Sequence, residues 1–567
     1  WKNMNAFQRK VFVARNPGPA AVFFDAVIQA FIRIILKYDQ SAISESQNGL
    51  FGRCSAYYAV VEAQGRGTLH CHMLVWIEGN PSPQELRDRM REDPAFQGRM
   101  FEWLESIIQC ELPSTSEVVL EIDGPLKPPE RIMSIDPRLH KEPHVHTMSE
   151  EEFENAMRAT VEELVIQSNW HAHKETCWKY LKPGEPRNDN TCRMRITGEV
   201  NPLTHLDPDT ESIILRRLHP RINNYNQLVM FLMRCNMDIK YVGSGEAAKA
   251  LVYYVTDYIT KAPLATHVGL SAVEYAIKKN NEKFPIPTTV ETVNKSLFTK
   301  TVMALMSKQE LSHQQVMSYL IGGGDFYSSH TFKPFRWGDI DRFIDRQEKE
   351  NSTAEPDDSD DENEEINEQE EVTLIVSDNY VGISSHSLDY PFRSADPEFE
   401  SLSLWEHEEW VTKVSTASEE KRLERAELAE VRRVSDEHSR NQHASRGRQA
   451  ELRGQMNANH PQSQTHVARF RRTPLVNVVL GETIARPDRG SKEREKWARA
   501  MLIFFKPWRS IKDLLNQGET WSDAFERTQF STYAQQVMRN MSVENECKDA
   551  RDAHDSLRRA GKARSML

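Results

Sequence analysis

The stretch that decides the fold is GRGTLHCHMLVWI, at residues 65–77. It begins with a glycine-rich turn and continues as a run of strand-forming residues, and a second strand-like run at 55–62 precedes the turn. Two such runs around a short glycine turn predict an antiparallel β-hairpin. Alternate side chains of a strand share one face, so His70 and His72 are expected to lie side by side.

Two neighbouring imidazoles can ligate one divalent metal ion, and a third, harder ligand would complete the site. The partner strand offers Glu62 and Gln64, which are also two residues apart and share a face. A carboxylate suits Mg²⁺ or Mn²⁺, so Glu62 is the first choice for the third ligand and Gln64 the second. The alternative interpretation of this pattern is a pair of half-buried histidines that bind no metal.

A second motif is YYVTDYITK at residues 253–261, in a segment with helical period. Tyr254 and Tyr258 are four residues apart, so their phenols share one helix face. A tyrosine hydroxyl can act as a nucleophile, and Lys261, one turn further on, could stabilise phosphate or phenolate charge. The alternative is that these aromatic side chains belong to a hydrophobic core.

The region around residues 171–195 contains ligand types that bind zinc. The candidate ligands for a structural Zn²⁺ are His171, His173, Cys177 and Cys192. Their spacing is not that of a standard zinc finger, so His205 or His219 could replace one of them, and a loop with free thiols is the alternative.

A basic and aromatic stretch follows at residues 215–226, LRRLHPRINNYN. Such a stretch suits phosphates and stacked bases, and a solvated charged face is the alternative. The candidate nucleic-acid-binding residues are Arg66 in the hairpin turn, Arg216, Arg217, Arg221 and Tyr225.

The chain has 567 residues and a formal net charge of −12, which taken alone argues against a nucleic-acid partner. However, 11 acidic residues and no Lys or Arg lie between Glu355 and Glu371. Without this run, which is expected to be a solvated linker, the charge is −1. Seven widely spaced cysteines do not form a disulfide framework and indicate a reducing, intracellular location.

The pattern predicts an α+β fold. A strand is expected at 11–14. The apolar segment at 18–37 has a polar stripe, which predicts an amphipathic helix that packs against a core. No membrane partner is therefore expected. Further helices are expected at 84–108 and 150–167, and residues 400–455 are expected to be helical and charged. The expected parts are 1–110 with the hairpin, 111–212 as an insertion with the candidate zinc site, 213–345 with the tyrosine helix, 346–372 as the acidic linker, and 373–567 as a charged, mostly helical region.

The His-X-His pair followed by YxxxYxxK resembles the two-tyrosine, HUH-type replication-initiator endonucleases. The surrounding sequence narrows the resemblance to the Helitron transposases of rolling-circle transposons, with wording closest to fungal versions. The matching stretches cover most of the chain; they include VEAQGRGTLHCHMLVWIEG at 61–79, MRCNMDIKYVGSGEAAKALVYYVTDYITK at 233–261 and SLFTKTVMALMSKQELSHQQVMSYLIGGGDFYSSHTF at 296–332.

This resemblance implies an antiparallel-sheet HUH core that nicks and joins single-stranded DNA at transposon ends. His70 and His72, with Glu62 or Gln64, would hold Mg²⁺ or Mn²⁺, and Tyr254 or Tyr258 would form a 5′-phosphotyrosine. It also implies a nuclear location. The alternatives are an inactive DNA-binding relic of such a transposase, or the helicase-associated region of a longer protein.

Two departures from the family pattern stand out. The middle residue of the histidine pair is Cys71, which is small but apolar. The sequence contains no GxxxxGK[ST] phosphate-binding loop, so no ATP site is expected in this chain. The start at Trp1 in mid-pattern indicates a fragment, whose helicase module would lie in a longer protein.

Overall fold

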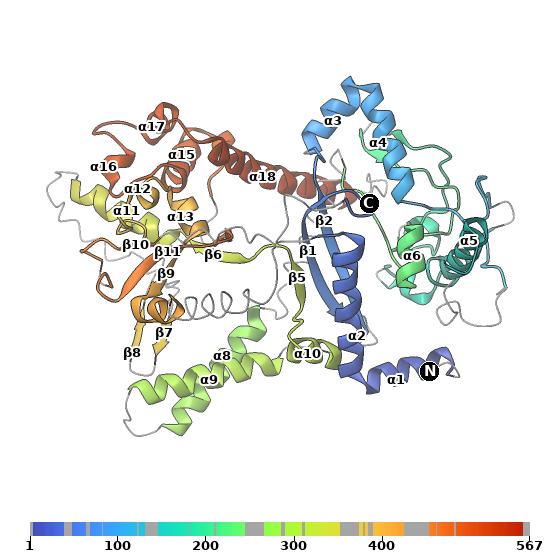
Figure 1. Ribbon diagram of the computed structural model, residues 1–567, viewed down its shortest axis with the longest axis horizontal. Helices are drawn as coiled ribbons and strands as arrows, with labels where there is room; N and C mark the ends of the chain where they lie inside the picture. Colours follow the sequence, from blue (N-terminus) through green and yellow to red (C-terminus); the bar gives the residue numbers. More distant parts are fainter. Residues whose placement is uncertain are drawn as a thin grey trace, which may run out of the picture. The chain divides into compact units, whose positions relative to one another are not determined.

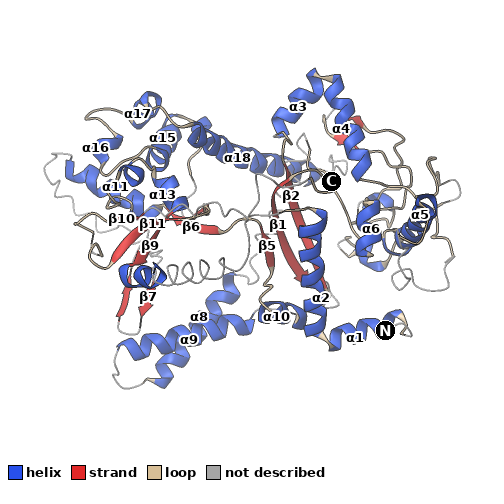
Figure 2. Cartoon of the chain, viewed as in Figure 1, coloured by secondary structure: helices blue, strands red, loops and turns tan. Residues whose placement is uncertain are grey.

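The computed structural model describes the chain in ordered stretches (Figure 1). These are residues 4–38, 48–63, 68–81, 83–121, 124–130, 146–179, 181–194, 196–208, 211–243, 266–284, 290–308, 312–351, 374–377, 380–383, 389–423, 453–460, 462–480 and 484–559. The chain forms two compact units, Trp1–Ser329 with Ser542–Leu567, and His330–Met541. Both combine helices with small sheets (Figure 2), so the structure is compatible with the predicted α+β class. The predicted division into five parts stays a prediction.

The first unit is centred on the hairpin. Strands β1 (Cys54–Ala63) and β2 (Leu69–Ile77) pair antiparallel, which confirms the predicted hairpin, and β5 (Phe326–Ser328) joins the free edge of β1, also antiparallel. One face of this sheet packs on helix α2 (Pro17–Ala30), its π-helical extension η1 (Phe31–Ile35) and α10 (His313–Leu320). Ala59, Val61 and Tyr327 are the buried strand residues of this core.

The predicted strand at 11–14 is wrong, because these residues lie in helix α1 (Ala6–Arg15). The Asn5 side chain accepts a hydrogen bond from the backbone N–H of Gln8, and the Gln8 side chain accepts one from Asn5, which forms a capping box. Pro17 then starts α2 in the first helical turn. The β-branched residues at 11 and 13 favoured a strand locally, but the helix caps on both sides outweigh that preference.

The predicted amphipathic helix at 18–37 packs against the sheet as expected, but its polar stripe does not face solvent throughout. Asp25 accepts a hydrogen bond from the Tyr327 hydroxyl on the packed side, whereas Phe23 is 71% and Ile34 66% exposed. By length and composition Pro17–Ile35 is also apolar enough to cross a membrane, with a mean hydropathy of 1.6. A core helix meets the same criterion, so the segment is weak evidence for a membrane span.

The remaining elements of this unit form three smaller cores. Helices α3 (Pro83–Glu92) and α4 (Pro94–Ile107) pack together, as do α5 (Glu150–Ser168) with α6 (Gln227–Met233), and α8 (Thr266–Lys283) with α9 (Val290–Lys308). Between α5 and α6 lie only short elements among the described residues, namely η4 (Glu175–Trp178), η5 (Asp189–Thr191), β3 (His205–Leu206) and β4 (Ile213–Ile214).

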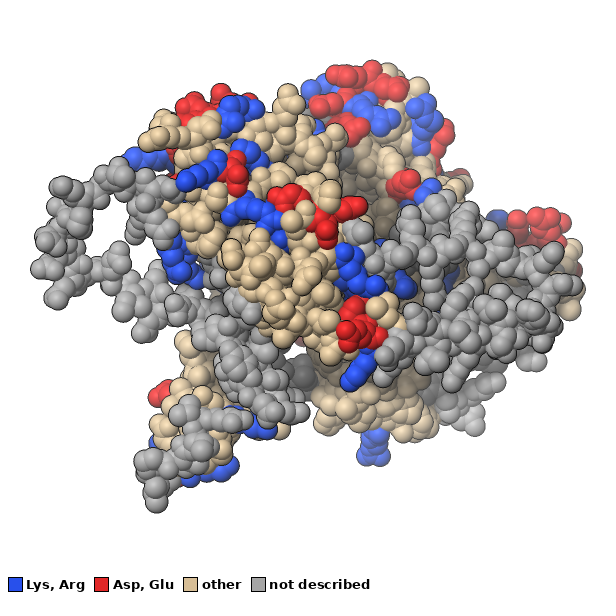
Figure 3. Space-filling view, turned by 60° about the vertical axis from the view of Figure 1, so that its left-hand side comes forward, with Lys and Arg blue, Asp and Glu red and all other residues tan. Residues whose placement is uncertain are grey.

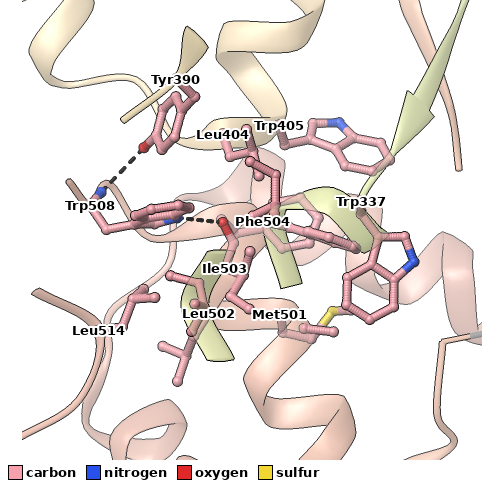
Figure 4. Close-up of a cluster of buried hydrophobic side chains, with 14 of the residues drawn as sticks. Trp337, Tyr390, Leu404, Trp405, Met501, Leu502, Ile503, Phe504, Trp508 and Leu514 are labelled. Carbon is pink, nitrogen blue, oxygen red and sulfur yellow. Dashed lines mark hydrogen bonds between the residues drawn. The ribbon is translucent and has the colours of Figure 1, made fainter. Parts of the chain in front are cut away.

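The second unit has an aromatic core (Figure 4). Helix α15 (Ser491–Phe505) contributes a run of buried residues at 500–505. Trp508 donates its backbone N–H to the Tyr390 hydroxyl and its indole N–H to the Ile503 carbonyl. A buried tryptophan whose N–H has a partner is a strong anchor for a core. The region 373–567, expected to be charged and mostly helical, thus contributes to a folded hydrophobic core.

The other elements of the second unit surround this core. The helices are α11 (Gly338–Asn351), α12 (Pro397–Glu400), α13 (Leu404–Trp410), η7 (Pro487–Arg489), α16 (Ile511–Leu514), α17 (Trp521–Arg527) and the first part of α18 (Thr532–Arg559). Strand β6 (Phe332–Arg336) pairs parallel with β12 (Val476–Leu480), and β7 (Leu374–Ser377) pairs antiparallel with β8 (Tyr380–Ile383). A third sheet has β11 (His466–Phe470) in the middle, with β10 (Arg453–Gln455) on one side and β9 (Val411–Ser415) on the other. The prediction that 400–455 is helical throughout is therefore wrong at β9 and β10, because both strands pair with β11, which lies beyond the end of that segment. The acidic run at 355–371 lies outside the described residues.

Candidate metal centre

The hairpin brings three potential metal ligands together on one face of the sheet. Glu62 of β1 lies directly opposite His70 of β2, and His72 lies two residues further along β2. Directly opposed residues of an antiparallel pair have Cβ atoms about 4.5–5.5 Å apart, so side chains of this length meet. The strand period and the pairing register together therefore bring all three side chains to one place.

The ligand atoms form a close triangle. His70 Nε2 lies 3.0 Å from His72 Nε2, and Glu62 Oε2 lies 3.7 Å from the first and 3.8 Å from the second. Adjacent ligands of an octahedral Mg²⁺ or Mn²⁺ ion are about 3 Å apart, since each ligand bond is about 2.0–2.1 Å for Mg²⁺. The separation of the two imidazole nitrogens matches this spacing, whereas the Glu62 carboxylate lies farther from both and would have to move closer to join the same ion.

The three side chains are accessible to a ligand but partly sheltered. The His70, His72 and Glu62 side chains are 28%, 43% and 31% exposed. Burial and the neighbouring His72 lower the pKa of His70, against the opposing effect of Glu62. His70 is thus biased towards the neutral form that binds metals.

Cys71 lies between the two histidines, and its side chain is on the other face of the sheet. There it packs with the core that includes Ile32 and Tyr327, and burial raises the pKa of its thiol to about 12. A small apolar residue fills this position without reaching the metal-ligand face. The departure from a bulky residue at position 71 therefore leaves the arrangement of the histidines intact.

Several predicted site residues lie outside the described residues. They are Gln64 and Arg66 in the hairpin turn, and Tyr254, Tyr258 and Lys261 in the predicted tyrosine helix. Gln64 as a metal ligand, Arg66 as a DNA contact, Tyr254 or Tyr258 as the nucleophile and Lys261 as the charge stabiliser therefore stay predictions.

The four candidate zinc ligands come together as the sequence predicted. The ligand atoms of His171, His173, Cys177 and Cys192 all lie within 4.8 Å of one another. The alternative ligands do not share this cluster among the described residues: His219 packs on the Trp170 ring, and the His205 ring lies near the Leu203 carbonyl.

Two of the predicted nucleic-acid contacts are wrong. Arg221 and Tyr225 are each only 1% exposed. Arg221 is enclosed by Glu121 and Asp189, and Tyr225 donates its hydroxyl to the Glu111 carbonyl within a hydrophobic core. Side chains without access to solvent do not contact a phosphate or a base, so both residues have structural roles.

Arg216 and Arg217 are partly exposed, and both have protein partners. Arg216 forms ion pairs with Glu105 and Glu111, and Arg217 donates to the Ile222 carbonyl and the Asn224 side chain. Their role in nucleic-acid binding stays a prediction. On the face shown in Figure 3, the coloured Lys and Arg side chains lie among Asp and Glu side chains rather than in one continuous basic surface.

Three aromatic side chains that were not predicted as site residues lie on the metal-ligand face. Tyr58 has the same strand parity as Glu62, and Trp76 the same parity as His72. Phe326 of β5 lies opposite Val60, and its ring stacks on Tyr58 with centroids 6.1 Å apart. The face on which Tyr58 and Trp76 lie could have been predicted from the two-residue period of a strand. The pairing of β5 with β1 could not, because the two strands are more than 260 residues apart and neither sequence indicates its partner.

Comparison with known protein families gives a match to one part of the chain. Residues 2–75 match the model of the Helitron helicase-like domain at the N-terminus, a segment that ends within β2 after both histidines. The match supports a Helitron-type, transposase-related protein, as the sequence motifs indicated. A search of curated proteins finds no match to this chain.

Proposed function

We propose that this chain is a metal-dependent endonuclease and strand transferase that acts on single-stranded DNA at the ends of a Helitron-type transposon. The observation that supports this most directly is the triangle of Glu62, His70 and His72 on an accessible face of the hairpin. The Helitron helicase-like match includes all three residues. A relic that binds DNA without cleaving it is the competing function.

The three side chains have distinct tasks in this proposal. A bound Mg²⁺ or Mn²⁺ would polarise the scissile phosphate and neutralise charge on its oxygens. The two imidazoles supply neutral nitrogen ligands, and Glu62 supplies the negative charge that favours a hard cation. The β-sheet holds the three positions in fixed register, so binding requires only that the Glu62 side chain move closer to the histidine pair.

The cleavage step uses a tyrosine of the YxxxYxxK motif. The hydroxyl oxygen of Tyr254 or Tyr258 bonds to the scissile phosphorus and its proton passes to solvent. The bond from phosphorus to the 3′ oxygen breaks, and the 3′ oxygen takes up a proton from solvent. The products are a 5′-phosphotyrosine and a free 3′ hydroxyl, and Lys261 stabilises the charge that develops. Attack of a 3′ hydroxyl on the phosphotyrosine reverses the step and joins strands without ATP.

An adduct assay tests this function. The full chain is incubated with single-stranded oligonucleotides of transposon-end sequence, with Mn²⁺ or with EDTA, and separated in SDS. We expect a covalent protein–DNA band that requires Mn²⁺ and disappears in the double variant Tyr254→Phe/Tyr258→Phe. DNA binding without an adduct in any divalent metal would support the relic, and an adduct that persists in the double variant would contradict the tyrosine assignment.

The exposed aromatic side chains beside the metal centre suit single-stranded DNA. Trp76 is 49% and Phe326 50% exposed on the face that contains the histidines. Stacking of a base on an aromatic ring contributes about 1–3 kcal/mol. We therefore expect that Phe326→Ala weakens binding of a single-stranded oligonucleotide by about 5- to 150-fold at constant salt.

Fluorescence anisotropy with a labelled oligonucleotide measures this effect. Phe298→Ala is the matched control, because Phe298 is 64% exposed on α9, away from the sheet, and its removal should leave affinity unchanged. Equal affinities of the Phe326 variant and the unmodified protein would show that bases do not stack on this face.

A further inference from the structure

A second group of ligands lies in the part of the first unit that has little regular structure. His171 and His173 follow the C-terminal end of α5, Cys177 lies in η4, and Cys192 directly follows η5. Both cysteines are buried, at 4% exposure each, and the histidines are half-buried. Two thiols and two imidazoles therefore converge in a sheltered place.

Two of the separations in this group match the edges of a zinc tetrahedron. His171 Nε2 lies 3.2 Å from His173 Nδ1 and 3.4 Å from Cys192 Sγ. With Zn–N bonds of about 2.0–2.1 Å and Zn–S bonds of about 2.3 Å, tetrahedral ligand atoms are about 3.3 Å (N to N) and about 3.5 Å (N to S) apart. Cys177 lies within the same 4.8 Å limit and completes a Cys₂His₂ set.

A buried ion-pair network orients one of these histidines. His173 presents Nδ1 to the cluster and its other nitrogen, Nε2, to the Asp189 carboxylate. Arg221 in turn donates to Asp189 at 2.8 and 2.9 Å and to Glu121 at 2.6 and 2.8 Å. A ligating histidine that donates its second N–H to a carboxylate is the usual support of a zinc site, because it fixes the tautomer and the ring orientation.

Two backbone hydrogen bonds also connect the segments that contain the ligands and their supporting network. The His171 N–H donates to the Arg221 carbonyl at 2.7 Å, and the Arg193 N–H donates to the Cys177 carbonyl at 3.2 Å. Apart from short helical turns, the described residues between 171 and 204 have no regular secondary structure to hold them. A metal ion that joins four positions of such a segment would add to the hydrogen bonds that hold it.

We propose that His171, His173, Cys177 and Cys192 bind a structural Zn²⁺ ion, which the Asp189–Arg221–Glu121 network supports from outside. All four positions are protein ligands, so the site is closed and orders the fold instead of binding substrate. Two thiolates balance the charge of the ion, which suits a buried site. The proposal does not depend on the nuclease function, since the two clusters share no residue.

Metal analysis and cobalt substitution of the full chain test the proposal. We expect a tightly bound Zn²⁺ ion that survives dialysis. After exchange for Co²⁺, we expect the intense visible bands of a tetrahedral ion and a thiolate-to-cobalt charge-transfer band. The Glu62–His70–His72 centre contains no thiolate, so its occupancy does not produce that band. A chain without tightly bound zinc, or a cobalt spectrum without thiolate character, would overturn the assignment.

Variants locate the site and test the outer network. Cys192→Ser should remove the charge-transfer band, and Asp189→Asn should weaken zinc affinity about 10- to 100-fold in competition with a chelator. Cys235→Ser is the matched control, because Cys235 is exposed and outside the cluster, and it should leave zinc content unchanged. His70→Ala/His72→Ala should also keep the thiolate–cobalt band, even if it abolishes nuclease activity.

Normal zinc content and an unchanged cobalt spectrum in the Cys192 variant would contradict the proposal, as would a disulfide between Cys177 and Cys192 in the purified protein.

Discussion

Replacement of His70 and His72 together by alanine is expected to lower the rate of adduct formation with single-stranded DNA by about 10³-fold or more. Both imidazoles converge with Glu62 on one face of the hairpin, so their removal leaves a single carboxylate. Charge stabilisation by a bound metal contributes several kcal/mol to phosphoryl transfer, and each 1.36 kcal/mol corresponds to about a tenfold change in rate. A quenched time course with Mn²⁺ measures the effect.

The control for this prediction is His205→Ala. His205 lies in β3, outside the ligand triangle, and its replacement should leave the rate unchanged. Oligonucleotide affinity should change little in the double histidine variant, because the aromatic side chains on the sheet remain. If the double variant forms adduct at the rate of the unmodified protein, the hairpin is not the metal centre of the reaction.

The second large effect is expected in the other unit, where Glu419→Gln should lower the free energy of unfolding by about 3–5 kcal/mol. Glu419 is 4% exposed and forms ion pairs with Arg422, Arg453 and Arg469. Loss of its charge leaves three neighbouring guanidinium groups without their shared carboxylate. Hydrogen exchange of the β9 and β11 amides, measured at pH 7, should become about 100-fold faster or more.

The effect of Glu419 depends on pH in a defined direction. Hydrogen bonds from Arg422 and Arg453, together with the charge of Arg469, lower the pKa of Glu419 from 4.5 to about 2, although burial opposes this shift. A group whose pKa is depressed by folding stabilises the folded state above its unfolded pKa. The difference between the unmodified protein and Glu419→Gln should thus be complete above pH 4.5 and shrink as the pH falls towards 2.

Glu526→Gln is the matched control for this stability measurement. Glu526 also pairs with an arginine of the same unit, Arg494, but the two side chains are 67% and 44% exposed. Exposed pairs contribute about 0–1 kcal/mol, so exchange should change little. Similar effects of the two substitutions would show that the buried cluster around Glu419 contributes no more to the free energy of unfolding than an exposed ion pair.

The hairpin could be predicted because its signals are local. The turn, the strand-forming runs and the period of two are all contained in residues 55–77, and the observed register places Glu62 opposite His70. The candidate zinc cluster was recognisable from its ligand types alone. Its supporting network was not, because Glu121 and Arg221 are 100 residues apart and meet only in the folded chain.

The basic stretch at 215–226 shows the limit of sequence patterns most clearly. Arginine next to tyrosine suits nucleic acid on a surface, but the same side chains suit a buried network when carboxylates surround them. Here Arg221 and Tyr225 are enclosed, because Glu121, Asp189 and the α5–α6 core converge on them. Burial is a property of distant neighbours, and the sequence of the stretch does not contain it.

By itself the sequence determined the hairpin, the shared face of the two histidines, the ligand types of both clusters and the resemblance to Helitron proteins. These depend on residue type and on spacing over a few turns or strands. Only the tertiary structure decided that β5 brings Phe326 to the face that contains Glu62 and the two histidines, that Arg221 binds Asp189 beside the His–Cys cluster, and that the C-terminal part has an aromatic core. The physical reason is that these features come from contacts between segments far apart in the chain, whose partners no local pattern specifies.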